Sequence, residues 1–260
     1  MTRPVTAPRP VGISWRPGAP RFGRSAELAV AGGVQAVLLA VIRPGLAGLA
    51  VGVLYAVAAW AILSAAFRRR RAFRPADHVT LTRVVLTGGV TALVAEHLLG
   101  GGHTWTLVVV ASTALVLDGV DGRVARRTGT VSRLGARFDM EVDAVLVLVL
   151  SVDVAWSMGP WVLAIGAMRY VFGAAARVAP WLRADLRPSL ARKGVAVVQG
   201  VTLVAAASGV VPYAGALVAV ALALLVWSFG RDVIWLFTQR TREGSTDGAR
   251  RPRVLDPVAR

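Results

Sequence analysis

Residues 118–143 read DGVDGRVARRTGTVSRLGARFDMEVD, and they hold five of the fourteen acidic residues of this 260-residue chain. Asp118 and Asp121 are three positions apart, and Asp139 and Asp143 are four apart, so each pair shares one face of a helix. The first pair ends one apolar run and the second pair opens the next. We therefore expect two antiparallel helices to bring four carboxylates together at one edge of a helical bundle.

Such a cluster needs bound cations, because carboxylates packed side by side near a bilayer repel one another. Hard divalent ions prefer oxygen ligands, which favours Mg²⁺ first and Mn²⁺ second. A pair of metal ions about 3.5–4 Å apart is a common arrangement for phosphoryl chemistry. The alternative is that these acids sit in headgroup water at helix ends, which the paired helical spacing disfavours. An EF-hand is excluded, because its loop needs acids at positions one, three and five.

The rest of the chain is both apolar and basic. Lys and Arg together number 30, the formal net charge is +16, 55% of the residues are hydrophobic, and the mean hydropathy is +0.61. This combination excludes a disordered polycation, and it does not fit a soluble nucleic-acid-binding domain. It is typical of an all-α integral membrane protein whose cations lie outside the bilayer. The chain has no cysteine, so it forms neither disulfides nor thiolate metal sites.

Eight apolar runs predict eight helices, since a bilayer core of about 30 Å needs roughly 20 apolar residues per span. The first is short and contains Gln35, so it is either a span or an interfacial helix. A hairpin turn is expected at 43–45. The runs are Leu28–Ile42, Leu46–Phe67, Val79–Leu99, Trp105–Leu117, Val142–Met158, Trp161–Val178, Gly194–Val211 and Ala214–Phe237.

Residues 1–25 predict a disordered basic tail, 26–67 a transmembrane hairpin, 75–238 a six-helix domain, and 239–260 a basic, unstructured tail. The connections between the runs alternate in charge. Those near 68–74, 123–137 and 183–193 are rich in Arg, whereas 100–104, 159–160 and 208–213 are nearly free of cations. The positive-inside rule therefore predicts a multi-pass plasma-membrane protein with both termini and the acidic cluster in the cytoplasm.

The acidic stretch resembles the signature of the CDP-alcohol phosphatidyltransferases, Asp-x2-Asp-Gly-x2-Ala-Arg-x8-Gly-x3-Asp-x3-Asp. Every fixed position of the signature is filled. These positions are Asp118, Asp121, Gly122, Ala125, Arg126, Gly135, Asp139 and Asp143. The resemblance implies a catalytic core of six transmembrane helices, matching the domain at 75–238. It also implies transfer of a phosphatidyl group from CDP-diacylglycerol to an alcohol with release of CMP, and a homodimer in the lipid bilayer.

The resemblance also implies roles for single residues. Asp118, Asp121, Asp139 and Asp143 would hold two Mg²⁺ or Mn²⁺ ions, and Asp143 would also act as the general base on the acceptor. The implied CDP-lipid contacts are Asp77, Thr80, Gly122, Ala125, Arg126, Ser132 and Gly135. Asp77 and Thr80 have a second interpretation, because either residue is also suited to cap a helix. Arg83, one turn further along, is expected to reach a phosphate or to extend to the membrane interface.

The acceptor is less clearly marked. Arg169, Arg177 and Lys193 partly resemble the pattern of members that use glycerol 3-phosphate, but Tyr170 and Val195 depart from it. A cation within an apolar run is costly unless paired, so Arg169 either binds a phosphate or forms a salt bridge, with Asp153 or Glu96. The acceptor alcohol thus stays open: glycerol 3-phosphate, inositol or its phosphate, serine, or another. An inactive scaffold, a transporter, and an enzyme with another nucleotide-activated donor are the alternative functions.

Overall fold

The structure is a computed structural model that describes residues 24–66, 75–102, 104–128, 133–183 and 189–250. In this part of the chain all regular elements are helices. They are α1 (Arg24–Ile42), α2 (Leu46–Ala66), α3 (Pro75–His97), α4 (Thr104–Thr128), α5 (Arg133–Met158), η1 (Pro160–Val162), α6 (Leu163–Val178), η2 (Pro180–Arg183), α7 (Leu190–Ala207) and α8 (Ala214–Arg250). The eight expected helices are confirmed. The expected N-terminal tail falls almost wholly outside the described residues.

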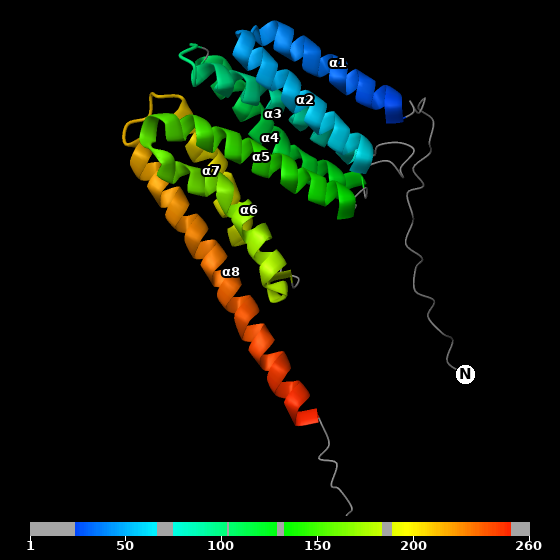
Figure 1. Ribbon diagram of the computed structural model, residues 1–260, viewed down its shortest axis with the longest axis vertical. Coiled ribbons are helices and arrows are strands. Elements are labelled where there is room, and N and C mark those ends of the chain that lie inside the picture. Colours follow the sequence, from blue (N-terminus) through cyan, green and yellow to red (C-terminus); the bar gives the residue numbers. More distant parts are fainter. Residues whose placement is uncertain (1–23, 67–74, 103, 129–132, 184–188, 251–260) are drawn as a thin grey trace, which may run out of the picture.

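α1 and α2 form the expected hairpin, which packs on α3 (Figure 1). Arg43 makes the turn with a positive φ of 46°. Close helix approach depends on glycine: a Cβ on Gly48 would lie 2.7 Å from the Ala92 carbonyl oxygen, and one on Gly52 would lie 3.0 Å from the Ala92 Cβ. Small residues at such contacts let membrane helices approach each other at the backbone.

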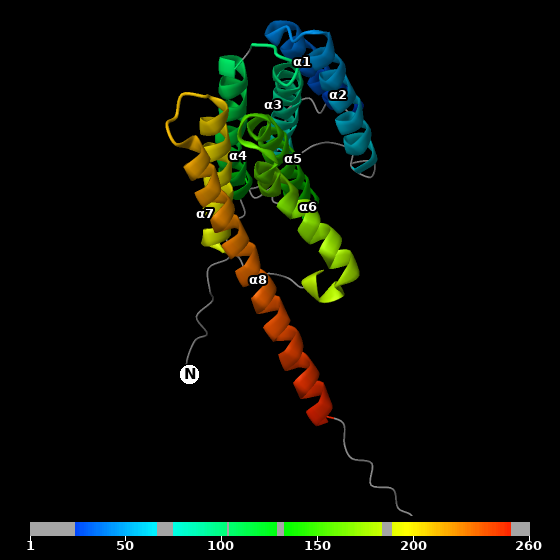
Figure 2. The ribbon, with the colours of Figure 1, turned by 60° about the vertical axis from the view of Figure 1, so that its left-hand side comes forward.

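α3 is the central helix of the molecule, since it packs against α1, α2, α4 and α5. Of its apolar segment 67% is buried, against 17–22% in the apolar segments of α1, α2, α6 and α8. The core around it is built from Val90 and Leu93 of α3, Ala111 of α4, and Leu146 and Leu150 of α5. α7 closes this core from the side of α4 and α5 (Figure 2).

Among the residues that the structure describes, five helical segments are long and apolar enough to cross a membrane: α1, α2, α3, Pro160–Val178, and α8. The apolar part of α4, Thr104–Gly119, is shorter. Many large apolar side chains point outward, among them Val41, Leu54 and Ile62. Lipid tails are as apolar as these side chains, so exposing them to the bilayer carries no free-energy penalty.

The turns that follow α1, α3, α5 and α7 lie on the left-hand side of Figure 1, whereas α1, α2, α4 and α5 have their opposite ends on the right-hand side and α6 and α8 run downward. α8 differs from the expectation: it continues to Arg250, whereas the sequence predicts an unstructured tail over 239–260. Extending an existing helix needs no new nucleation. The polar residues that follow the apolar run contain no proline as far as Arg250, so they continue the helix.

Candidate functional site

The signature stretch lies on two helices, as the spacing of its acids predicts. α4 continues past its apolar part to Thr128, and α5 begins at Arg133, nine residues before the apolar run that marks it in the sequence. Asp118 therefore stands on α4, while Asp139 and Asp143 stand one turn apart on α5.

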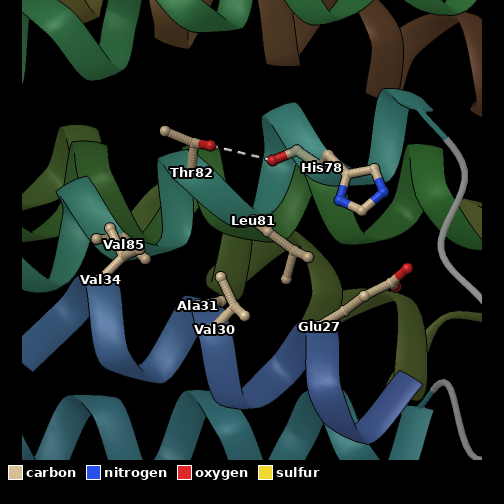
Figure 3. A pocket seen from close by; sticks show the side chains of 8 residues that line it. All are labelled: Glu27, Val30, Ala31, Val34, His78, Leu81, Thr82 and Val85. Atoms are coloured by element: carbon tan, nitrogen blue, oxygen red, sulfur yellow. Dashed lines mark hydrogen bonds between the residues drawn. The ribbon is translucent and has the colours of Figure 1, made fainter. Parts of the chain in front are cut away.

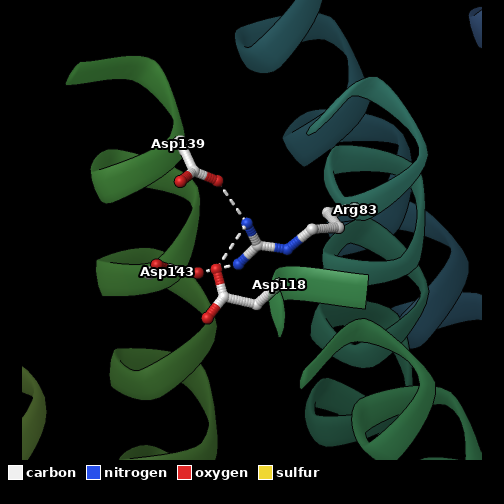
Figure 4. A network of polar contacts seen from close by, with 4 residues as sticks. All are labelled: Arg83, Asp118, Asp139 and Asp143. Atoms are coloured by element: carbon white, nitrogen blue, oxygen red, sulfur yellow. Dashed lines mark hydrogen bonds and ion pairs between the residues drawn. The ribbon is translucent and has the colours of Figure 1, made fainter. Parts of the chain in front are cut away.

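Three carboxylates meet at this end of the bundle (Figure 4). One oxygen from each of Asp118, Asp139 and Asp143 lies within 4.8 Å of the others. Their side chains are 32–37% exposed, so the cluster is half-buried rather than solvated. Oxygen ligands on three converging side chains fit a hard divalent cation, which makes the donor set compatible with Mg²⁺ or Mn²⁺.

Arg83 of α3 occupies the middle of this cluster. Its guanidinium contacts Asp118 at 3.0 Å and also contacts Asp139 and Asp143, and its side chain is fully buried. The sequence did not predict these partners for Arg83. A buried cation is held where opposite charge is densest.

The remaining signature residues are placed only by their backbone. Asp121, Gly122, Ala125 and Arg126 lie on the helical part of α4 after Asp118, and their side chains are outside the described residues. Because α4 stays helical, Asp121 is one turn beyond Asp118 on the same side of the helix.

Of the other residues expected to contact the CDP-lipid, the structure describes the side chain of Thr80 and the position of Gly135. Thr80 is buried near the start of α3, and Gly135 is half-buried in the first turn of α5. Asp77 is in the first turn of α3, but its side chain is not described, and Ser132 falls outside the described residues.

Of the three basic residues expected at the acceptor site, one forms an ion pair and two are exposed. Arg169 of α6 donates to Glu141 over 2.6 Å, and this partner is neither of the two acids expected for it. Glu141 is two residues from Asp143, so it faces away from the acidic cluster around the helix. Arg177 and Lys193 are exposed, and neither contacts the cluster among the described side chains.

The two acids considered as partners of Arg169 form contacts at the opposite end of the bundle. Asp153, only 2% exposed, lies 2.7 Å from the Nδ1 atom of His97. Glu96 accepts a 2.6 Å hydrogen bond from the backbone N–H of Gly45 and so ties the N-terminal hairpin to α3. Sequence reasoning missed both contacts, because residues 56 and 51 positions apart meet only through helix packing.

The sequence also left the contact made by Arg83 undecided. One feature could have indicated it, because Arg83 is the only Arg or Lys within the apolar run Val79–Leu99. A lone cation inside a span needs an opposite charge at the same depth, and the signature stretch holds five of the fourteen acids of the chain.

A separate cavity of about 430 Å³ lies between α1 and α3 (Figure 3). Val30 and Val34 of α1 and Leu81 and Val85 of α3 form its apolar wall. Polar groups, among them His78, occur toward the end where α3 begins. None of the three clustered carboxylates lines it, so this cavity is distinct from the acidic site.

Comparison with known proteins adds two relatives. CDP-diacylglycerol-serine O-phosphatidyltransferases from two strains of Helicobacter pylori, J99 and 26695, are 42% and 40% identical to the chain over 72 residues. The matched segment covers 26% of this chain and 30% of each relative, so the chain spans less than a third of their length. No solved structure matches the chain.

The family itself is shown by a much longer match. The sequence profile described as CDP-alcohol phosphatidyltransferase matches residues 73–227, which is more than half of the chain. This range begins just before α3 and ends within α8, so it contains Arg83 and the whole acidic cluster and leaves out the α1–α2 hairpin. The apolar helices agree with the multi-pass membrane location of such a protein. The chain therefore belongs to the CDP-alcohol phosphatidyltransferase family.

Proposed function

We propose that this protein transfers a phosphatidyl group from CDP-diacylglycerol to a small alcohol and releases CMP, as a step of phospholipid biosynthesis. The observation that carries the proposal is the meeting of Asp118, Asp139 and Asp143 at one end of the bundle. Family membership and two relatives named for the same donor support it.

Four aspartates are assigned to hold divalent metal ions: the three clustered ones and Asp121, one turn beyond Asp118 on α4. Bound Mg²⁺ or Mn²⁺ supplies charge neutralisation for the diphosphate and for the departing CMP. The protein's part is to present these oxygens from two rigid helices, so that little reorganisation is needed during the reaction.

Asp143 is assigned as the general base. The acceptor hydroxyl gives its proton to the carboxylate while its oxygen forms a bond to the phosphorus next to the diacylglycerol. The bond from that phosphorus to the bridging oxygen breaks, and CMP leaves with the electron pair. The product is the phosphatidyl ester of the acceptor, so every atom is accounted for.

The donor is assigned to the α4 segment that follows Asp118. Gly122 and Ala125 have little bulk, which lets the nucleotide approach the helix closely. Arg126 offers a planar fork for a phosphate. Asp77, Thr80, Ser132 and Gly135 are assigned to the same CDP-lipid site, on the basis of the family resemblance.

Serine is the first acceptor to test, because both relatives are named for it. The glycerol 3-phosphate alternative relies on Arg169, Arg177 and Lys193. It has less support, since Arg169 contacts Glu141 and that pair lies on the far face of α5 from Asp143. A phosphate acceptor at Arg169 would have to displace this ion pair.

The active site is assigned to the cytoplasmic side of the plasma membrane, together with both termini, and a homodimer is expected. The support is the alternation of basic and uncharged connections, which the positive-inside rule links to orientation. The acidic cluster adjoins the Arg-rich sequence 123–137, which this rule places in the cytoplasm.

The decisive experiment is to measure CMP release by the purified protein in lipid nanodiscs. The mixture contains CDP-diacylglycerol, Mn²⁺ or Mg²⁺, and one candidate acceptor at a time, beginning with serine. Asp143→Asn is the control variant, since it keeps the size of the side chain and removes the base. We expect release that depends on metal and acceptor, at least about 10²-fold slower in the variant.

Three outcomes would change the proposal. Release by Asp143→Asn near the wild-type rate would remove Asp143 as the base. Binding of CDP-diacylglycerol without turnover on any acceptor would point to an untested acceptor. Absence of both binding and turnover would favour another nucleotide-activated donor or an inactive scaffold.

A further inference from the structure

Arg83 is an unusual neighbour for a set of metal ligands. Its guanidinium reaches across from α3 to Asp118 on α4 and to Asp139 and Asp143 on α5, so one buried cation joins three helices (Figure 4). Its side chain is completely buried, whereas the three carboxylates are each about one-third exposed. The cation thus approaches the cluster from the protein interior, and the acids keep an open side.

The charges explain why an arginine is stable there. Three ionised carboxylates and one guanidinium leave two formal negative charges in excess, so the cluster holds the arginine and still attracts divalent cations. Removing the arginine without metal would leave three carboxylates within 4.8 Å of one another and no opposing charge among these contacts. A buried charge cluster that loses one partner is strongly destabilised.

The same contacts create a competition. The guanidinium contacts the Oδ1 atom of each aspartate, and these carboxylates are the proposed metal ligands. A cation bound to those oxygens would repel a guanidinium held at the same place. Asp143 is also the proposed base, and a carboxylate held by an arginine is a poorer proton acceptor.

We propose that Arg83 is an exchangeable counterion, which neutralises the aspartate cluster in the metal-free protein and moves off it when divalent metal binds. The inference deepens the proposed function, because it concerns the aspartates assigned there as metal ligands. Arg83 is a positioning residue in this account. It keeps α3, α4 and α5 together before the metal arrives, and it lowers the apparent affinity of the site for metal.

The test compares Arg83→Gln with the wild type in nanodiscs. Arg192→Gln is the matched control, since Arg192 donates to Asp232 over 3.1 Å between α7 and α8, away from the cluster. The first readout is the melting temperature without metal, and the second is the apparent Kd for Mn²⁺ from the electron paramagnetic resonance signal of the free ion.

For Arg83→Gln we expect the metal-free melting temperature to fall by about 10 °C, as for loss of a buried ionic partner. We expect the apparent Kd for Mn²⁺ to decrease about tenfold, because the competing cation is gone. Arg192→Gln should leave the Kd for Mn²⁺ unchanged. Saturating Mn²⁺ should therefore raise the melting temperature of Arg83→Gln more than that of the wild type.

A charge-rescue variant separates neutralisation from packing. Arg83→Gln combined with Asp118→Asn removes one negative charge together with the positive one, and we expect it to regain about half of the lost melting temperature in the absence of metal. Should Arg83→Gln fail to fold without metal, the protein is purified in Mn²⁺ and its apparent Kd is measured in the folded, metal-bound state by competition with a chelator of known affinity. Arg83→Lys, which keeps the charge, then serves as the folded metal-free reference.

The proposal is overturned if folded Arg83→Gln binds Mn²⁺ with the wild-type Kd or more weakly, because Arg83 would then support the metal site instead of competing for it. An unchanged metal-free melting temperature, or a double variant no more stable than the single one, refutes the counterion role. These outcomes are distinct from failure of the proposed function, which is absence of CMP release by the wild type.

Discussion

Replacing Gly166 by alanine tests how closely α6 packs against the helix that carries Asp139 and Asp143. A Cβ at Gly166 would lie 2.5 Å from the Cα atom of Leu148 on α5 and 3.0 Å from the Oγ atom of Ser151. Ordinary contact begins at 3.4 Å, so the two backbones must separate by about 0.9 Å. The nearest atom is the Leu148 Cα, which belongs to the backbone, so no flexible side chain can move aside to relieve the contact.

The expected cost follows from two opposing effects. Overpacking of a tight core contact costs about 1–3 kcal/mol. Alanine regains about 1 kcal/mol relative to glycine within a helix. The net expectation is a loss of up to about 2 kcal/mol, or a melting temperature lower by up to about 8 °C for a chain of this size.

Gly173 provides the matched control on the same helix, because a Cβ there would meet nothing within 4 Å. Gly173→Ala should be neutral or up to about 1 kcal/mol more stable. Thermal unfolding in nanodiscs, followed by the fluorescence of the eight tryptophans, measures both variants. If Gly166→Ala melts at or above the temperature of Gly173→Ala, the close approach of α5 and α6 is refuted.

The same substitution links packing to chemistry. Leu148 is five residues beyond Asp143 on α5, so a displacement of α5 at this contact is carried toward the proposed base. A misplacement of about 1 Å at a reacting group lowers the rate by up to about 10²-fold. We expect Gly166→Ala to slow CMP release by more than its loss of stability explains, and Gly173→Ala to release CMP at the wild-type rate.

Three further predictions concern the hairpin, the far end of the bundle and the orientation. Tyr55→Phe removes a 3.2 Å hydrogen bond to the carbonyl of Val84 and should cost about 1 kcal/mol in thermal unfolding; no change would contradict the α2–α3 contact. His97→Ala removes the partner of buried Asp153 and should cost about 2 kcal/mol, whereas Asp153→Asn should cost less because it keeps a hydrogen-bonding group. A reporter fused after Arg260 should be cytoplasmic, and an external signal would reverse the assigned topology.

Much of the fold could be predicted from the sequence, because helix formation and apolar length are local properties. The eight apolar runs appear as eight helices, and the turn at 43–45 joins the first two. The ends of the helices were less predictable. α5 begins nine residues before its apolar run and α8 ends well after its own, since a polar segment continues a helix when no residue breaks it.

The acidic site was predictable in part for the same reason. Spacings of three and four place Asp118, Asp139 and Asp143 on the correct faces of α4 and α5, and the structure brings these three together. The partner of Arg169 was not predictable, because Glu141 is 28 residues away and is selected by how α6 lies against α5. The sequence offered Asp153 and Glu96 as partners, and it carries no distance between helices by which to choose among acids.

The sequence by itself determined the local features of this protein: which segments are helical, which are apolar enough for a bilayer, and which carboxylates share a helix face. Tertiary structure alone decided that Arg83 lies among those carboxylates, that His97 contacts Asp153, and that Gly166 lies against Leu148. The physical reason is that periodicity and composition act over a few neighbouring residues. The rotation and separation of helices depend instead on the sum of many small packing and charge interactions between distant parts of the chain.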